Sequence, residues 1–299
     1  MRVLLTGGIG QLGSELRPRL AEMGWEVIAP GPEELDLARP EAIDSFWAET
    51  RPGLVINAAA YTAVDRAESE PGQAFAVNAD APARLARLCR DAGAGLVHVS
   101  TDYVFDGTKT TPYTEDDPVN PLGVYGRSKA AGEEAVRALC PRHVVIRTSW
   151  LYSAHGANFV KTVLRLAAER EVLRIVDDQR GCPTSAADLA QAIAAIARRL
   201  GQGAGSILPW GLYHYCGRGE TTWYGFAREI LGLIQERGLA RGVRVLPIST
   251  AEYPTPARRP AYSVLDCRRI EAAFDLRRPL WTESLARVIA QLLAAPGAA

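Results

Sequence analysis

The chain has 299 residues, of which 47% are hydrophobic and 23% are charged, proportions that are ordinary for a globular protein. Its 34 basic residues balance its 34 acidic ones, so the charge gives no reason to expect nucleic acid or a membrane surface as a partner. No apolar run approaches the ~20 residues of a membrane span, and the 5 cysteines lack zinc-site spacing; we therefore expect a cytoplasmic protein with buried, reduced thiols.

The first half of the chain alternates short apolar runs with helical patterns. Strands are predicted at Val3–Leu5, Val27–Ala29, Leu54–Asn57, Leu96–Ser100 and Val144–Arg147, and helices at Gln11–Met23, Pro40–Thr50, Val77–Asp91 and Tyr125–Leu139. This alternation predicts right-handed βαβ units, and the continuous apolar strands predict a parallel sheet covered on both faces. The expected fold class is α/β, with a Rossmann-type doubly wound parallel sheet.

The second half is less regular. Helices are predicted at Asn158–Arg170, Ala186–Leu200, Trp223–Arg237 and Ser284–Leu293, and strands at Val172–Val176, Leu212–Tyr215 and Val243–Ile248. The proline-rich stretch Tyr253–Pro260 predicts an extended loop, and the tail after Ala294 is expected to fray. We expect residues 1–150 to form an NAD(P)-binding Rossmann domain. Residues 151–299 should mostly form a smaller α/β substrate-binding domain, with some segments returning to the first.

A glycine-rich turn follows the first strand directly. Gly7, Gly10 and Gly13 occur with the spacing G-x-x-G-x-x-G, just before the first predicted helix. Such glycines allow a tight turn, a close approach of the backbone to a pyrophosphate, and close packing of helix on strand. The helix N-terminus would then face the anion with free N–H groups. The strand–turn–helix context predicts dinucleotide binding.

The residues after the second strand leave the choice between NADPH and NADH open. That strand ends in Ala29-Pro30-Gly31, which provides neither the acid typical of NAD-binding proteins nor an arginine for a 2′-phosphate. Asp36 follows later and could contact the adenine end of the cofactor. The alternative interpretation of Asp36 is a solvated turn residue.

A second pattern indicates proton-transfer chemistry. Tyr125 and Lys129 lie four residues apart at the start of a predicted helix, which places them on one face. A nearby ammonium should lower the tyrosine pKa and suit it to exchange a proton with a carbonyl oxygen. Thr101 closes the fourth strand, at the sheet edge where ligands bind in parallel sheets. Its hydroxyl could hydrogen-bond the same oxygen.

These motifs resemble the extended short-chain dehydrogenase/reductase family, and further segments narrow the match. The chain is similar to the dTDP-4-dehydrorhamnose reductases from end to end. The matching segments are GQLG at 10–13, NAAAYTAVD at 57–65, STDYVF at 100–105, RTSWLY at 147–152, DQRGCPT at 178–184, TWY at 222–224 and YPTPARRP at 253–260.

The resemblance implies a reaction and a set of roles. The reaction is hydride transfer from NADPH or NADH to C4 of dTDP-4-dehydro-β-L-rhamnose, which gives dTDP-L-rhamnose. Tyr125 would be the acid, with Lys129 and Thr101 as its catalytic helpers. The implied substrate contacts are Thr101, Asp102 and Trp150, and the implied cofactor contacts are Gly7, Gly10, Gln11, Leu12, Gly13, Asp36, Leu37, Ala60, Tyr61, Thr62, Val99, Tyr125 and Lys129. Arg258 and Arg259 are weaker candidates for the diphosphate.

The resemblance also suggests a homodimer bridged by Mg²⁺, because in some family members carboxylates of the subunits bind a shared Mg²⁺ ion. Glu15 fits one such position. The second region reads Ser185-Ala186-Ala187-Asp188, which has fewer acids than that arrangement uses. We therefore do not favour Mg²⁺ as a ligand, and a homodimer stays an open alternative.

Other functions share this fold. A 4,6-dehydratase would have a second acid after Asp102, where this chain has Tyr103. A 4-epimerase would hold NAD tightly throughout its cycle. Another sugar-nucleotide 4-ketoreductase stays open. A non-catalytic alternative is an NADP-binding regulatory subunit resembling the methionine adenosyltransferase β subunit; the full set of Thr101, Tyr125 and Lys129 favours catalysis over it.

Overall fold

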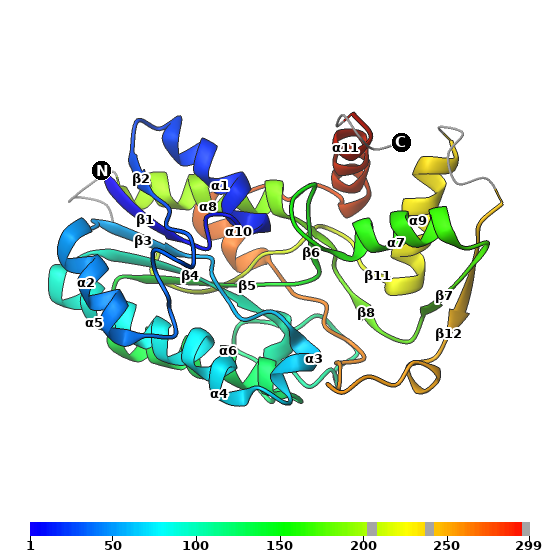
Figure 1. Ribbon diagram of the computed structural model, residues 1–299, viewed down its shortest axis with the longest axis horizontal. Coiled ribbons are helices and arrows are strands. Elements are labelled where there is room, and N and C mark those ends of the chain that lie inside the picture. Colours follow the sequence, from blue (N-terminus) through cyan, green and yellow to red (C-terminus); the bar gives the residue numbers. More distant parts are fainter. Residues whose placement is uncertain (202–207, 237–241, 295–299) are drawn as a thin grey trace.

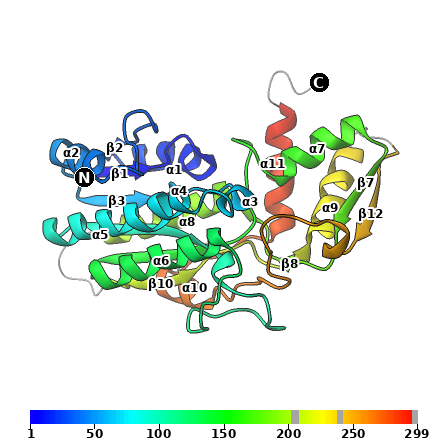
Figure 2. The same cartoon turned by 60° about the horizontal axis from the view of Figure 1, so that its bottom comes forward.

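The computed structural model describes residues 1–201, 208–236 and 242–294. Arg237, predicted to end one helix, and the tail after Ala294 lie outside these ranges. The described chain has two parts that lie side by side (Figures 1 and 2). One is built on a large parallel sheet, and the other is a smaller cluster of helices with short strands.

Six parallel strands form the large sheet, in the order β10-β5-β4-β3-β1-β2. They are β1 (Arg2–Thr6), β2 (Glu26–Ile28), β3 (Leu54–Asn57), β4 (Gly95–Thr101), β5 (His143–Thr148) and β10 (Gly211–His214). The chain turns to opposite sides of β1 for β2 and β3, so the carboxyl ends of β1 and β3 border the crevice where ligands bind in such sheets. The predicted α/β class with a Rossmann-type sheet is confirmed.

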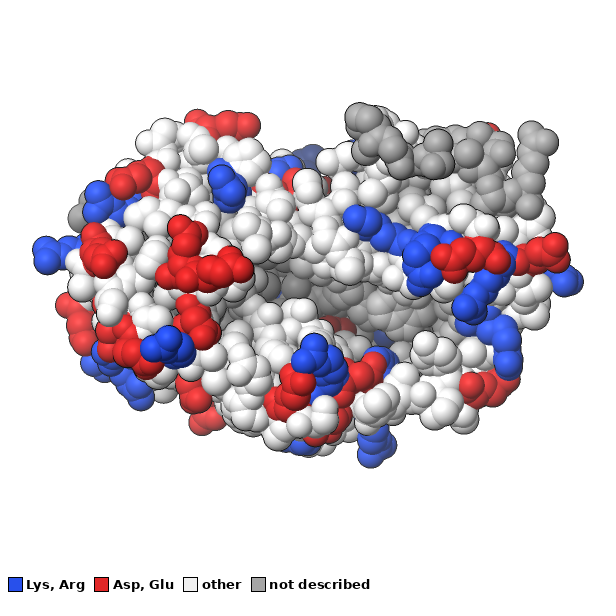
Figure 3. Space-filling view, viewed as in Figure 1, with Lys and Arg blue, Asp and Glu red and all other residues white. Residues whose placement is uncertain are grey.

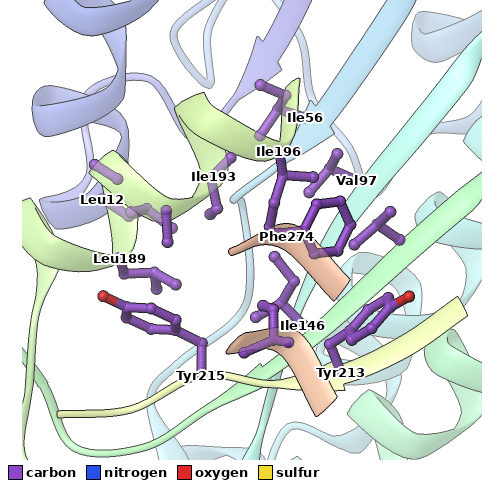
Figure 4. Packing of buried hydrophobic residues seen from close by; sticks show 14 of the residues in the cluster. Leu12, Ile56, Val97, Ile146, Leu189, Ile193, Ile196, Tyr213, Tyr215 and Phe274 are labelled. Atoms are coloured by element: carbon purple, nitrogen blue, oxygen red, sulfur yellow. The ribbon is translucent and has the colours of Figure 1, made fainter. Parts of the chain in front are cut away.

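Helices cover both faces of the sheet. One face carries α1 (Gln11–Ala21), α8 (Ala186–Gly201) and α10 (Arg268–Phe274); the other carries α2 (Pro40–Thr50), α5 (Ala81–Ala92) and α6 (Val124–Leu139). Successive strand residues point to opposite faces. Ile56 and Val97 pack with Ile193 of α8 (Figure 4), whereas Val55 and Leu96 join the other core.

The smaller part has a core of its own. Its elements are α7 (Phe159–Glu169), α9 (Trp223–Gln235), α11 (Trp281–Ala294) and the parallel pair β7 (Val172–Val176) and β12 (Arg244–Ile248). Two short pairs, β6 (Leu151–Tyr152) with β9 (Thr184–Ser185) and β8 (Arg180–Gly181) with β11 (Thr221–Thr222), complete it. The second half of the chain also supplies β10, α8 and α10 to the large sheet.

One predicted helix differs from expectation. The pattern at Val77–Asp91 predicts one continuous helix, but a π-helical segment at Ala76–Asp80 precedes α5. The short helices α3 (Val64–Ala67) and α4 (Pro71–Phe75) come before it, and 3-10 turns lie at Asp102–Val104 and Thr250–Glu252. Residues 253–260 contain no helix or strand, as the prolines predict.

Candidate active site

The glycine loop joins β1 to α1 in a conformation that side chains would not permit. Gly7 has a φ of +71°, and a Cβ there would lie 2.8 Å from the backbone nitrogen of Ala59. A Cβ on Gly13 would lie 2.1 Å from the carbonyl oxygen of Gly7, so this glycine lets α1 pack close to the strand. The loop has the cradle that a pyrophosphate requires, with the N-terminus of α1 behind it.

A cavity of about 240 Å³ lies beside this loop, and we call it the β1–β2 pocket. Four of the predicted cofactor residues line it: Gly7, Asp36, Leu37 and Ala60. Its other lining residues are Thr6, Ile9, Pro30, Pro32, Leu35, Ala59, Gln73 and Val77. The largely apolar walls suit an adenine ring.

Further predicted cofactor residues lie at the start of α1 and after β3, and they differ in the burial and contacts of their side chains. Leu12 is only 4% exposed and packs in the core, which leaves its backbone for ligand contact. The Gln11 side chain accepts a hydrogen bond from Asn158 Nδ2 (3.0 Å), so it ties the loop to the smaller part of the molecule. Gly10 is the N-cap of α1. Thr62 is exposed after β3.

Tyr125 and Lys129 lie one turn apart on α6, beside the end of β4. The buried Lys129 ammonium donates to the carbonyl oxygen of Val99 (2.7 Å), which joins two of the predicted cofactor residues. Burial lowers the pKa of Lys129 to about 8. The expectation for Tyr125 is wrong in this structure: burial raises its pKa to about 12, because a low-dielectric environment disfavours the phenolate.

Thr101 and Asp102 close β4 at the same place. The Thr101 hydroxyl donates to Asp102 Oδ1 (3.1 Å). Hydrogen bonding between Thr101 and Tyr125 lowers the Tyr125 pKa, against the larger effect of burial. Asp102 is 2% exposed, and burial raises its pKa to about 6. Its Oδ2 atom has no hydrogen-bond partner among the described residues. A buried carboxylate oxygen without a partner is well placed to accept a hydrogen bond from a ligand hydroxyl group.

Trp150 follows β5 with a strained backbone, since its φ is +48°. Its indole stacks on that of Trp223, with centroids 3.6 Å apart and planes 7° apart. A Cβ on Gly181 would lie 2.6 Å from the Trp150 ring. Both Trp223 and Gly181 come from the smaller part, so the indole stands where the two parts of the molecule meet. Figure 3 shows a hollow between these parts.

Asn78 is a residue of this region that the sequence did not single out. It lies in the π-helical segment and is fully buried. Its side chain bonds both the N–H (2.9 Å) and the carbonyl oxygen (3.0 Å) of Tyr61, and it donates to Ser128 Oγ (3.0 Å) on α6. It thereby holds the loop after β3 against the helix of Tyr125 and Lys129. The sequence does contain a signal that could have identified Asn78, because it is a polar residue on the apolar face of a predicted helix.

A salt bridge also connects the two parts. Arg259 in the proline-rich loop pairs with Asp65 at the start of α3 (2.8 Å), and Asp65 also accepts from the N–H of Ala257 (3.1 Å). The Arg259 guanidinium is therefore engaged by a carboxylate. Arg258 is exposed.

The carboxylates considered for magnesium lie elsewhere. Glu15 and Asp188 line a cavity of about 1020 Å³. Glu15 pairs with Arg19 (2.8 Å) and Asp188 with Arg287 (2.9 Å), so a cation there would face two guanidinium groups. Among the described residues, no group of three or more His, Cys, Asp or Glu side chains could hold a metal ion. The residues present do not fit a magnesium site.

Comparisons with known proteins cover nearly the whole chain. The model of the RmlD substrate binding domain family matches residues 1–294. A dTDP-4-dehydrorhamnose reductase from Sinorhizobium fredii is 45% identical over 98% of both chains. A probable dTDP-4,6-dihydroxy-2-methyloxan-3-one 4-ketoreductase from Streptomyces antibioticus is 43% identical, covering 99% of this chain and 97% of its own. The structure of dTDP-4-dehydrorhamnose reductase from Bacillus anthracis in complex with NADP is 36% identical, with a TM-score of 0.89 and coverage of 97% and 99%.

Proposed function

Because the chain belongs to the RmlD substrate binding domain family, we propose that it is a reductase acting on the C4 keto group of dTDP-4-dehydro-β-L-rhamnose, with NADPH or NADH as reductant and dTDP-L-rhamnose as product. The observation that carries the proposal is the meeting of Thr101, Tyr125 and Lys129 at the carboxyl end of β4, in a chain this similar to named reductases over its full length.

The cofactor would be held along the edge of the large sheet. The glycine loop and the N-terminus of α1 would bind its pyrophosphate, and the β1–β2 pocket its adenosine. The bound nicotinamide supplies the hydride, which the protein's own side chains cannot provide. Lys129, fixed at the end of β4 by Val99, would orient the nicotinamide ribose.

Proton transfer falls to Tyr125. Hydride arrival at C4 leaves negative charge on the attached oxygen, and the phenol donates its proton there, so that the ketone becomes a hydroxyl group. The raised pKa of Tyr125 keeps this proton in place at neutral pH until it is needed. The Thr101 hydroxyl would bond the same oxygen. The buried Oδ2 of Asp102 would accept a hydrogen bond from a neighbouring sugar hydroxyl.

The smaller part of the molecule would provide the sugar-nucleotide side of the site. We assign residues 1–150 mainly to cofactor binding and residues 151–299 mainly to substrate binding, with β10, α8 and α10 serving the large sheet. Trp150 would offer an indole edge or face to the deoxysugar. A second candidate function is reduction of a related dTDP-4-keto sugar, which the similarity to the Streptomyces ketoreductase favours.

The proposal extends to partners and location. No helix among the described residues is long and apolar enough to cross a membrane. The cysteines are buried and unpaired, which suits a reducing cytoplasm. A homodimer is the assembly to test, by sedimentation at several protein concentrations.

The decisive test follows the loss of reduced-nicotinamide absorbance with enzymatically made dTDP-4-dehydro-L-rhamnose and either NADH or NADPH. Rapid oxidation, with dTDP-L-rhamnose identified as product by NMR, is the expected result. A protein that binds the cofactor but turns over only a different dTDP-4-keto sugar would favour the second candidate. Binding of an enzyme partner without turnover of any keto sugar would favour the regulatory-subunit alternative.

A further inference from the structure

The helix that carries Tyr125 has no side-chain cap of its own. Its N-cap residue is Gly123, which cannot supply one, although the first N–H groups of a helix have no partner within the helix. Glu68, directly after α3, supplies the cap from another element. Its Oε1 atom accepts a hydrogen bond from the N–H of Val124 (2.7 Å). Val124 is buried, so its N–H would otherwise be a costly unpaired donor.

The close approach of this carboxylate explains why residue 123 is a glycine. A Cβ built on Gly123 would lie only 2.6 Å from Glu68 Oε1. The backbone there is extended, with φ −127° and ψ 173°, a conformation that alanine adopts without strain. Space for Glu68, and not the backbone conformation, therefore accounts for the missing side chain.

Tyr125 directly follows the residue that Glu68 holds, and further contacts fix the same turn of α6. The carbonyl oxygen of Tyr125 accepts a hydrogen bond from Ser128 Oγ (2.9 Å). Gly126 packs directly on the turn after β4, where a Cβ would lie 2.2 Å from the carbonyl oxygen of Tyr103. The backbone on both sides of Tyr125 is thus held by neighbouring elements, and Glu68 provides the contact on the N-terminal side.

We infer that Glu68 is a positioning residue for the proposed reaction. By fixing the start of α6, it places the Tyr125 phenol where the C4 oxygen receives its proton. An acid must stand within hydrogen-bond distance of that oxygen, and a displacement of about 1 Å can cost about 10²-fold in rate. Glu68 acts through the helix, because its contact is with the backbone of Val124. The inference rests on the proposed function for the role of Tyr125 as the acid.

The test compares wild type with Glu68→Ala and Glu68→Gln in the reduction of dTDP-4-dehydro-L-rhamnose by NADPH. Glu68→Ala should lower kcat at least ten-fold. The KM for NADPH should change by less than two-fold, because the glycine loop and the β1–β2 pocket are untouched. Glu68→Gln should keep kcat within three-fold of wild type, since its amide oxygen can still accept from the N–H of Val124. A merely structural role would not separate kcat from KM in this way.

Two further variants sharpen the test. Gly123→Ala should lower kcat by a similar factor, because its Cβ would push the Glu68 carboxylate away from Val124. The double Gly123→Ala, Glu68→Ala variant should be no slower than the slower single variant, since both changes break the same bond. Asp266→Ala is the matched control and should keep kcat within two-fold. It removes a carboxylate that accepts from the N–H of Arg268 (2.9 Å) at the start of α10, on the opposite face of the large sheet.

Hydrogen exchange of the Val124 amide, followed by NMR without substrate, gives a second readout. Exchange should be at least ten-fold faster in Glu68→Ala than in wild type and unchanged in Asp266→Ala. Unchanged exchange in Glu68→Ala, or a kcat within two-fold of wild type, would overturn the inference. So would equal losses of kcat in Glu68→Ala and Glu68→Gln. If wild type reduces no keto sugar while exchange at Val124 depends on Glu68, the proposed reaction is refuted and the role of Glu68 in holding α6 stands.

Discussion

Replacing Glu133 with glutamine should destabilise the protein strongly, because it leaves a buried cation unpaired. Glu133 on α6 and Arg147 on β5 have side chains only 3% and 2% exposed and share hydrogen bonds of 2.7 to 3.0 Å. A second polar neighbour, His214 Nε2 at 3.4 Å, cannot replace the carboxylate, since burial lowers the pKa of this imidazole to about 3 and keeps it neutral. Breaking such a pair costs about 3–5 kcal/mol, a large share of the ~5–15 kcal/mol that stabilises a typical protein.

Urea denaturation followed by circular dichroism would measure the free energy of unfolding. Glu169→Gln is the control, because it breaks an exposed pair with Arg165 (3.0 Å) that contributes less than about 0.5 kcal/mol. A combined Glu133→Leu, Arg147→Met variant should recover much of the loss, since a well-packed apolar pair needs no charge compensation. If Glu133→Gln costs no more than the Glu169 control, the buried pair is not the source of stability assigned to it.

Three further predictions concern the site. Tyr125→Phe should keep the affinity for the reduced cofactor within two-fold of wild type but lower kcat at least a hundred-fold. A near-normal kcat would show that Tyr125 is not the acid. Gly181→Ala should raise KM for the sugar nucleotide several-fold, because its Cβ would displace the Trp150 indole. Gly72→Ala is the control, because the space around its Cβ is open. An unchanged KM in Gly181→Ala would show that Trp150 does not contact the substrate. Asp102→Asn tests the raised carboxyl pKa: the Asp102 carboxyl alone should lower the stability of wild type by about 2–3 kcal/mol as pH rises from 4 to 7, since its folded pKa of about 6 exceeds the unfolded value. The variant should lack this loss. If the free energy of unfolding changes with pH in the same way in wild type and variant, the raised pKa of Asp102 is contradicted.

Local patterns predicted the sheet and the glycine loop well. The loop needs only three glycines between a strand and a helix, so Gly7, Gly10 and Gly13 mark it in the sequence itself. The pKa of Tyr125 could not be predicted from its spacing to Lys129, because burial is the main cause of its shift, and burial depends on the whole fold.

Contacts between segments that are far apart in the chain could not be predicted from the sequence either. Nothing near Asp65 in the chain indicates Arg259 as its partner, because the two residues meet only when the proline-rich loop crosses from one part of the molecule to the other. The Trp150–Trp223 stack is of the same kind. The π-helical segment that places Asn78 had a local signal, but a helical apolar pattern does not distinguish π from α geometry.

The last strand of the large sheet has a consequence for synthesis on the ribosome. β5 ends at Thr148, but its neighbour β10 begins only at Gly211. At about 5–20 residues per second, several seconds pass before β10 emerges, and until then β5 is an unpaired edge strand. A fragment that stops near residue 150 would keep that edge permanently and would leave Arg147 without His214 beside it. Such a fragment should aggregate, and chimaeras between relatives should fold best when β5 and β10 come from the same parent.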